Sequence, residues 1–150
     1  MNWKQIRARL NKFDTDFVGE QLNENLVAAE SAIGQNFPPS YRKFVAEYGC
    51  GAIDSEEIIG LGGPDHLSIL KLKAVFESRS KKMPNYLLPI RADGFGNYDC
   101  IDLRKPTEND EYEIVLWNHD DPNANNHQTI ARSFAIWLVG LLDMIEEDDD

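Results

Sequence analysis

The spacing of apolar side chains along the chain predicts five helices. In the first segment, Trp3, Ile6, Leu10 and Phe13 recur at the interval of one helical face. The last predicted helix runs from Ser133 to about Glu146 and carries the strongest stripe of this kind. The other three cover 23–34, the segment from Pro39 or Ser40 to Tyr48, and a segment that begins at Asp65 or Ser68.

Shorter runs of apolar residues between these helices predict strands. One strand or two lie in A-I-D-S-E-E-I-I, just before the glycine-rich turn Gly60–Pro64. Three further strands are predicted over 87–90, 98–103 and 113–119. Because only short turns separate successive strands, we expect antiparallel pairing. The pattern therefore predicts an α+β fold: a single domain with a mostly antiparallel sheet and helices packed against it.

Length and composition fit one soluble globular domain. The chain has 150 residues, of which 42% are hydrophobic and 27% charged, and we place the domain at 1–145. Residues 146–150, E-E-D-D-D, are expected to form a frayed acidic tail. No apolar run approaches the ~20 residues of a membrane span, and the N-terminus lacks the apolar core of a secretory signal. Cys50 and Cys100 form no recognisable pair, so we expect two buried thiols and a cytoplasmic location.

Negative charge is concentrated in two places. The net charge of −11 includes −5 from residues 146–150. Residues 93–121 hold nine acidic residues against Arg104 and Lys105, a net charge of −7, and the rest of the chain is almost neutral. Such a local field repels nucleic acid and speeds the encounter with a basic partner protein. The alternative is a solvated acidic surface that serves only solubility.

The segment R-A-D-G-F-G-N-Y-D-C-I-D-L (91–103) gathers glycines, aspartates and aromatic residues. A calcium loop of the EF-hand type needs an oxygen ligand at its third position and glycine at its sixth; counted from Asp93, these positions hold Phe95 and Tyr98. A phosphate-binding loop needs glycines that open a helix, whereas these glycines open a strand. The segment is therefore predicted to be a strand–turn–strand unit whose corner uses glycine or asparagine.

Side chains along the strand after this turn alternate between two faces. One face carries Tyr98, Cys100 and Asp102, and the other carries Asp99, Ile101 and Leu103. Because a buried lone carboxylate is costly, one of the aspartates must lie at the sheet margin or beside a partner. Phe95 and Tyr98 have acidic neighbours, as the anchor residues of protein interfaces often do. Phe95 folded back over the sheet edge is the alternative.

No specific catalytic constellation is present. There is no G-x-S-x-G, and Cys50 could meet a histidine only through the fold. A metal-dependent enzyme that uses His119, Asp120 and His127 is a further hypothesis, although these residues lie in a loop without helical ligand spacing. We therefore expect neither catalytic residues nor a cofactor.

Several segments, taken in order, resemble the SUKH superfamily of Smi/Knr-like proteins. They are the helix at Leu26–Ile33, I-G-Q-N-F-P-P-S-Y-R-K-F-V-A-E-Y-G, E-I-I-G-L-G, L-L-P-I-R-A-D-G-F-G-N-Y-D-C-I-D-L, E-I-V-L-W-N-H-D and R-S-F-A-I-W-L. The resemblance covers most of the chain and implies a single-domain α+β fold. It also implies the role of many bacterial members, which are cytoplasmic immunity proteins that bind and neutralise toxins, often nucleases. Some relatives resemble regulatory scaffolds instead.

Charge and resemblance together favour an immunity protein that occludes a cognate polymorphic toxin, such as a basic nuclease. The expected partner-binding residues come from the turn and from the loop after the third predicted strand of this group: Asp93, Phe95, Asn97, Tyr98, Asp99, Asp120 and Asp121. A non-catalytic adaptor that recruits a cellular partner is the alternative of another class. No direct contact with nucleic acid or membrane is expected.

Overall fold

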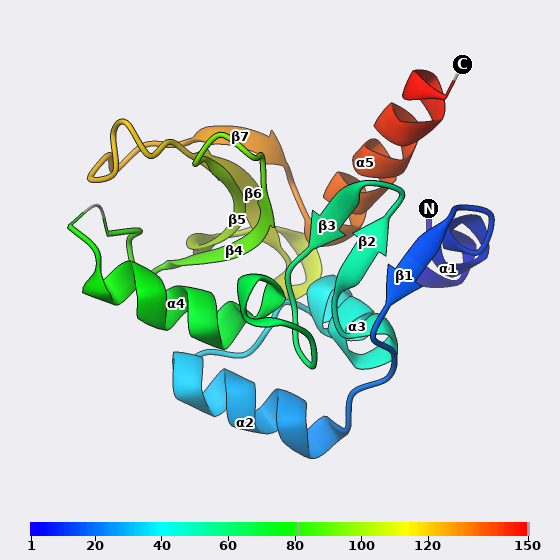
Figure 1. Ribbon diagram of the computed structural model, residues 1–150, viewed down its shortest axis with the longest axis horizontal. Coiled ribbons are helices and arrows are strands. Elements are labelled where there is room, and N and C mark those ends of the chain that lie inside the picture. Colours follow the sequence, from blue (N-terminus) through cyan, green and yellow to red (C-terminus); the bar gives the residue numbers. More distant parts are fainter. Residues whose placement is uncertain (81, 150) are drawn as a thin grey trace.

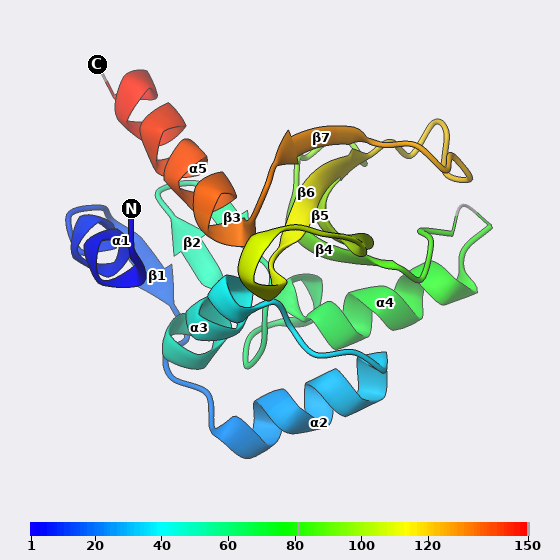
Figure 2. The same cartoon turned by 180° about the vertical axis from the view of Figure 1, so that it is seen from behind.

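The computed structural model describes residues 1–80 and 82–149, and within them the chain forms five α-helices and seven β-strands (Figures 1 and 2). The helices are α1 (Trp3–Leu10), α2 (Asn23–Ile33), α3 (Pro39–Tyr48), α4 (Ile69–Ser78) and α5 (Phe134–Asp148). The strands are β1 (Thr15–Phe17), β2 (Gly51–Ile53), β3 (Glu56–Ile58), β4 (Leu87–Ala92), β5 (Tyr98–Pro106), β6 (Tyr112–Trp117) and β7 (Gln128–Ala131). None of the helices in the described part of the chain has the length and apolar character needed to cross a bilayer.

The strands divide into two antiparallel sheets rather than forming one. The first sheet has the order β1-β2-β3 and the second is the meander β4-β5-β6-β7. The predicted α+β class and antiparallel pairing are therefore confirmed. One backbone hydrogen bond, from Ile59 N to Ile90 O at 2.8 Å, joins the chain just after β3 to β4.

Hydrogen bonds with side chains stabilise the starts of α1, α3 and α5. Asn2 and Gln5 form a reciprocal capping box at α1, and the Ser133 hydroxyl accepts a hydrogen bond from Ile136 N at α5. At α3, the Glu111 carboxylate accepts hydrogen bonds from Ser40 N and from Ser40 Oγ, at 2.9 Å and 2.8 Å. These bonds tie the start of α3 to the chain immediately before β6.

The structure differs from the sequence-based prediction at the ends of both sheets and at the C-terminus. The outer strands β1 and β7 were not predicted, because three- and four-residue strands carry too little periodicity. The expected fraying from residue 146 is wrong for Glu146–Asp148, because α5 continues to Asp148 and Arg9 lies 3.1 Å from the Glu146 carboxylate. Asp150 lies outside the described residues.

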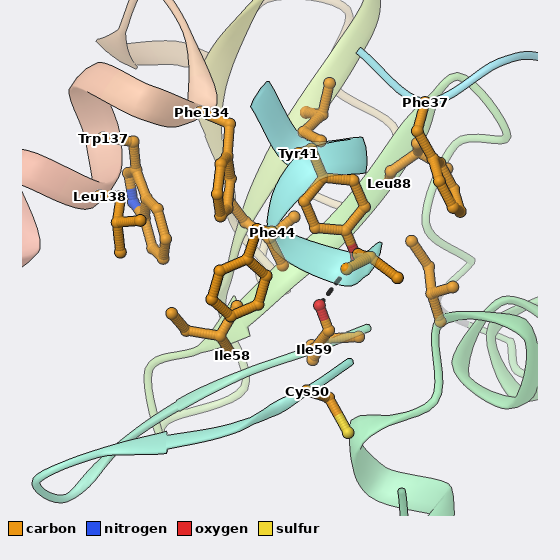
Figure 3. Close-up of a cluster of buried hydrophobic side chains, with 14 of the residues drawn as sticks. Phe37, Tyr41, Phe44, Cys50, Ile58, Ile59, Leu88, Phe134, Trp137 and Leu138 are labelled. Atoms are coloured by element: carbon orange, nitrogen blue, oxygen red, sulfur yellow. Dashed lines mark hydrogen bonds between the residues drawn. The ribbon is translucent and has the colours of Figure 1, made fainter. Parts of the chain in front are cut away.

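The main core lies between α3, α5 and the two sheets, and aromatic rings form its centre (Figure 3). The Phe134 ring packs against Tyr41, Phe44 and Trp137 at centroid distances of 5.1, 5.4 and 5.5 Å. The Tyr41 hydroxyl donates to Ile59 O at 2.8 Å, the dashed contact in Figure 3. Burial raises the pKa of Tyr41, so this donor keeps its proton at neutral pH.

A smaller cluster fills the other face of the four-stranded sheet, beneath α4. Its members are Phe76, Met83, Leu87, Cys100, Val115 and Trp117. The predicted alternation is confirmed, since Cys100 lies in this cluster and Ile101 in the main core. With both faces of the sheet covered, the β4–β5 turn and the β6–β7 loop remain at one end of the meander. The β5–β6 connection lies at the other end, beside α3.

Candidate protein-interaction site

The β4–β5 turn is held by one of its own carboxylates. Asp93 Oδ1 accepts hydrogen bonds from Phe95 N at 2.7 Å and from Asn97 N at 3.1 Å, while Asp93 N donates to Asn97 O. Gly94 and Gly96 have φ angles of 86° and 98°, which favour glycine. The predicted strand–turn–strand unit is confirmed, and Asp93 fixes its conformation.

An asparagine joins this turn to the β6–β7 loop. Asn97 Oδ1 accepts hydrogen bonds from the backbone N of His119 at 3.1 Å and from its Nδ1 at 2.7 Å. The approach is close, because a Cβ on Gly96 would lie 3.0 Å from the His119 ring. We call residues 93–97 and 118–121 the acidic tip. Five of the predicted contact residues lie in it: Asp93, Phe95, Asn97, Asp120 and Asp121.

The carboxylates of the acidic tip lack lysine and arginine partners among the described residues. Asp120 and Asp121 are exposed, and no lysine or arginine in 1–80 or 82–149 forms an ion pair with Asp93, Asp120 or Asp121. The imidazole of His119 lies 3.4 Å from the Asp120 carboxylate. The tip therefore presents uncompensated negative charge on a hydrogen-bonded frame.

Phe95 is the most exposed large apolar residue of the acidic tip. Its side chain is 82% exposed. The alternative in which Phe95 folds back over the sheet edge is therefore wrong. An aromatic ring that is held in water by a rigid turn has no role in the core of this chain, and it suits contact with another molecule.

Two residues of the expected interface lie elsewhere, and the structure corrects both positions. Tyr98 is half-buried against Phe76, with ring centroids 5.3 Å apart, and burial raises the pKa of its phenol. Asp99 points to the opposite face and is only 9% exposed. Trp137 Nε1 donates to Asp99 Oδ2 at 3.0 Å, and Arg91 Nη1 lies 3.6 Å from the same oxygen. Burial raises the pKa of Asp99, an effect that these two partners offset in part.

The acidic segment 93–121 is consequently not one acidic surface. Asp102 is fully buried and accepts hydrogen bonds from the backbone and guanidinium of Arg104. Glu111 caps α3, and Glu113 lies 3.8 Å from Lys105. Together with Asp99 and with Asp93, which holds the β4–β5 turn, at least five of the nine carboxylates serve contacts within the molecule. Both aspartates of β5 have found partners, as burial requires.

The arrangement does not form the proposed metal site. His119 binds Asn97, whereas His127 Nε2 lies 3.0 Å from the Tyr86 hydroxyl. Across 1–80 and 82–149, no three His, Cys, Asp or Glu side chains are grouped so that they could hold a metal ion. Burial raises the pKa of both Cys50 and Cys100, which disfavours the thiolate form that a nucleophile needs.

A cleft beside the β4–β5 turn has no counterpart in the sequence pattern. It has a volume of about 330 Å³ and is bordered by the β2–β3 turn, β4 and Gly94. Arg91 and Glu56 both line the cleft, and Arg91 Nη2 lies 2.6 Å from Glu56 Oε2. Because this pair joins residues 35 positions apart, no local pattern could have indicated it.

Comparisons with known proteins agree with this fold. Residues 4–143 match a family model described as SUKH_5, SMI1-KNR4 cell-wall. The SPbeta prophage-derived uncharacterized protein YokK of Bacillus subtilis (strain 168) is 23% identical over 180 residues, which cover 99% of this chain and 91% of that protein. A crystal structure of a protein from Pseudomonas syringae pv. tomato is similar with a TM-score of 0.70 and 17% identity, covering 93% of this chain and 98% of that one. The latter likeness shows a shared fold.

Proposed function

This chain belongs to the SMI1-KNR4 (SUKH_5) family, whose members are commonly immunity proteins, and on that premise we propose that it binds and neutralises a cognate polymorphic toxin through the acidic tip. Members of the family are generally non-catalytic, and inhibition by occlusion needs no catalytic group. The observation that carries the proposal is Phe95, a phenylalanine that is 82% exposed beside carboxylates that pair with no lysine or arginine of 1–80 and 82–149.

Electrostatics favours a basic toxin, such as a nuclease domain. A nuclease must attract phosphate, so its active face carries lysine and arginine. Asp93, Asp120 and Asp121 would meet that face and compete with the nucleic acid for it. Exposed carboxylates mainly accelerate association, and this acceleration weakens as salt screens the charges.

The ring of Phe95 is expected to contribute the binding affinity that exposed charges do not provide. Contacts between exposed ions contribute little net affinity, whereas a buried aromatic side chain at the centre of an interface often contributes most of it. The Asp93 hydrogen bonds and the link from Asn97 to His119 hold the turn before any partner arrives. A preformed turn lowers the entropy that is lost on binding.

The proposal is tested by co-expression with a toxin domain taken from a gene that neighbours the gene of this chain. We expect the wild-type chain to restore growth and Phe95→Ala to restore it weakly or not at all. Association with the purified toxin domain should slow as the salt concentration rises. Binding without rescue of growth would favour the adaptor instead, and a rate that is independent of salt would remove the electrostatic part.

A matched pair of charge reversals places the interface. Asp120→Lys/Asp121→Lys changes two exposed carboxylates at the acidic tip. Asp148→Lys/Asp149→Lys makes the same change at the end of α5, on the opposite side of the molecule from the β6–β7 loop (Figure 1). Only the first pair should lower the association rate strongly. Equal effects of the two pairs would indicate a general charge effect rather than a contact surface.

A further inference from the structure

A second concave surface lies between the four-stranded sheet and α5, separate from the acidic tip. This groove has a volume of about 370 Å³, within the range of pockets that bind ligands. The residues that define it come from four elements: Arg91, Asp99, Ile130, Trp137, Gly140 and Met144. Its walls are mostly apolar, and its polar groups converge at the floor.

The floor holds a carboxylate with one unused oxygen. Asp99 is nine-tenths buried, and its contacts with Trp137 and Arg91 both use Oδ2. Within 1–80 and 82–149, no residue donates a hydrogen bond to Oδ1. Arg91 also pairs with Glu56, so the two carboxylates share one guanidinium and the group keeps a net negative charge. An occupant with a hydrogen-bond donor, and best a cation, complements this floor.

The walls continue into an exposed apolar border. Ile130, Ile136 and Met144 are 43%, 56% and 38% exposed. All three residues line the groove, and their exposed fractions show that its apolar rim is open to solvent. The surface of a partner protein can cover such a rim, and an exposed apolar patch around a recess is typical of protein contacts.

Gly140 leaves the wall of the groove without a side chain on α5. It lies in the middle of α5, where glycine destabilises a helix relative to alanine. A Cβ at Gly140 would meet no heavy atom within 4 Å, so packing within the chain does not require glycine there. With Ile136 and Met144 it forms a line at intervals of four residues, distinct from the buried stripe of α5. The missing side chain leaves room for an apolar group from outside.

We propose that this groove binds a segment of a partner protein that presents an apolar side chain next to an arginine or lysine. The apolar side chain lies over Gly140 between Ile130 and Ile136, and the cation donates a hydrogen bond to Asp99 Oδ1. The site stands independently of the toxin proposal, because none of its residues belongs to the acidic tip.

Short peptides test the recognition chemistry directly. The probe is acetyl-Ile-Arg-Ile-amide, titrated into the intact protein while the indole N–H resonance of Trp137 is followed by NMR. We expect a saturable shift of that resonance. Acetyl-Ile-Gln-Ile-amide lacks the charge and acetyl-Gly-Arg-Gly-amide lacks the apolar groups, so each should bind at least about tenfold more weakly. No saturable shift with the first peptide at millimolar concentration would overturn the proposal.

Two variants and one small molecule locate the site and its occupant. Gly140→Leu fills the groove and should abolish the shift, whereas Ser31→Leu adds the same side chain at an exposed position of α2 and should leave it unchanged. Asp99→Asn should remove the preference for arginine over glutamine. An effect of Gly140→Leu no larger than that of Ser31→Leu would place binding elsewhere. Butylguanidinium that binds as tightly as the first peptide would indicate a small-molecule pocket and contradict a protein partner.

Discussion

Asp93 and Asp99 lie six residues apart in one hairpin, and their surroundings are opposite. Asp93 accepts two backbone hydrogen bonds in a turn that faces water, while Asp99 lies at the floor of an apolar groove with an indole and a guanidinium as partners. The acidic tip therefore offers several charges that water solvates. The groove offers one charge from which water is largely excluded.

The contrast separates two ways in which a carboxylate can serve recognition. Exposed charges act over a distance close to the Debye length, about 8 Å at physiological salt, and mainly affect how fast partners meet. A buried carboxylate interacts strongly only with a group that reaches it, so it discriminates between occupants. The following variants test this contrast, beginning with the largest expected effect.

Asp102 is a fully buried carboxylate, because its side chain has no exposure to solvent. Asp102→Ala removes the acceptor of the Arg104 hydrogen bonds, so the donors of that guanidinium lose their carboxylate partner and must be solvated by water instead. We expect the free energy of unfolding to fall by about 2–3 kcal/mol, less than for a fully buried pair because Arg104 is partly exposed. Urea denaturation measures it. The exposed control Asp121→Ala should change stability by less than about 0.5 kcal/mol. A similar loss of stability in both variants would contradict the difference between buried and exposed carboxylates.

Asn97 is the residue that makes the acidic tip one unit. Asn97→Ala removes both hydrogen bonds to His119, so we expect a loss of about 1–2 kcal/mol in stability. Amide hydrogen exchange should accelerate in residues 118–121 and stay unchanged at Ile101 in the core of the sheet. Asn125→Ala is the matched control, because the Asn125 side chain is exposed and only its backbone carbonyl accepts a hydrogen bond. Equal exchange in the wild type and in Asn97→Ala would mean that turn and loop are independent.

Local patterns predicted the parts of this molecule that depend on neighbours in sequence. The five helices followed from apolar spacing, and the 91–103 hairpin followed from its glycines and from the failure of ligand spacing. The turn and the adjoining loop also leave two of the predicted contact residues, Phe95 and Asp120, exposed to water. These positions take their environment from residues within a few places along the chain.

The rest depended on contacts between distant segments. Alternation placed Asp99 on one face of β5, but Trp137, 38 residues away, determines that this face is covered. The groove also needs β7, a four-residue strand with no clear period. Gly140 inside an apolar helix was the one local signal for it. Counting charges along 93–121 overestimated the acidic surface for the same reason, because the partners of Asp99 and Glu111 come from other elements.

Asp99→Asn should produce a smaller effect, confined to part of the pH range. Because burial raises the pKa of Asp99 above the ordinary 3.8, ionisation disfavours the fold: the wild type is most stable below the ordinary pKa and loses this stability as the pH rises to the folded-state pKa. Asparagine does not titrate and can still accept from Trp137. The stability of Asp99→Asn relative to wild type should therefore increase from about pH 3 to about pH 7, measured by denaturation at each pH. A difference that stays constant across that range would contradict the assigned cause. Asp121→Asn, at an exposed position, should change stability little at any of these pH values.

Phe95→Ala should have the smallest effect on the isolated protein. The ring is 82% exposed, so its removal costs almost no burial and the free energy of unfolding should change by less than about 0.5 kcal/mol. The amides of Phe95 and Asn97 donate to Asp93 through the backbone, and alanine at position 95 keeps both hydrogen bonds. Thermal unfolding and the exchange rates of these two amides measure the outcome. A loss above about 1 kcal/mol would show that the ring packs within the chain, and Phe95 could then no longer be the free aromatic group that the acidic tip offers to a partner.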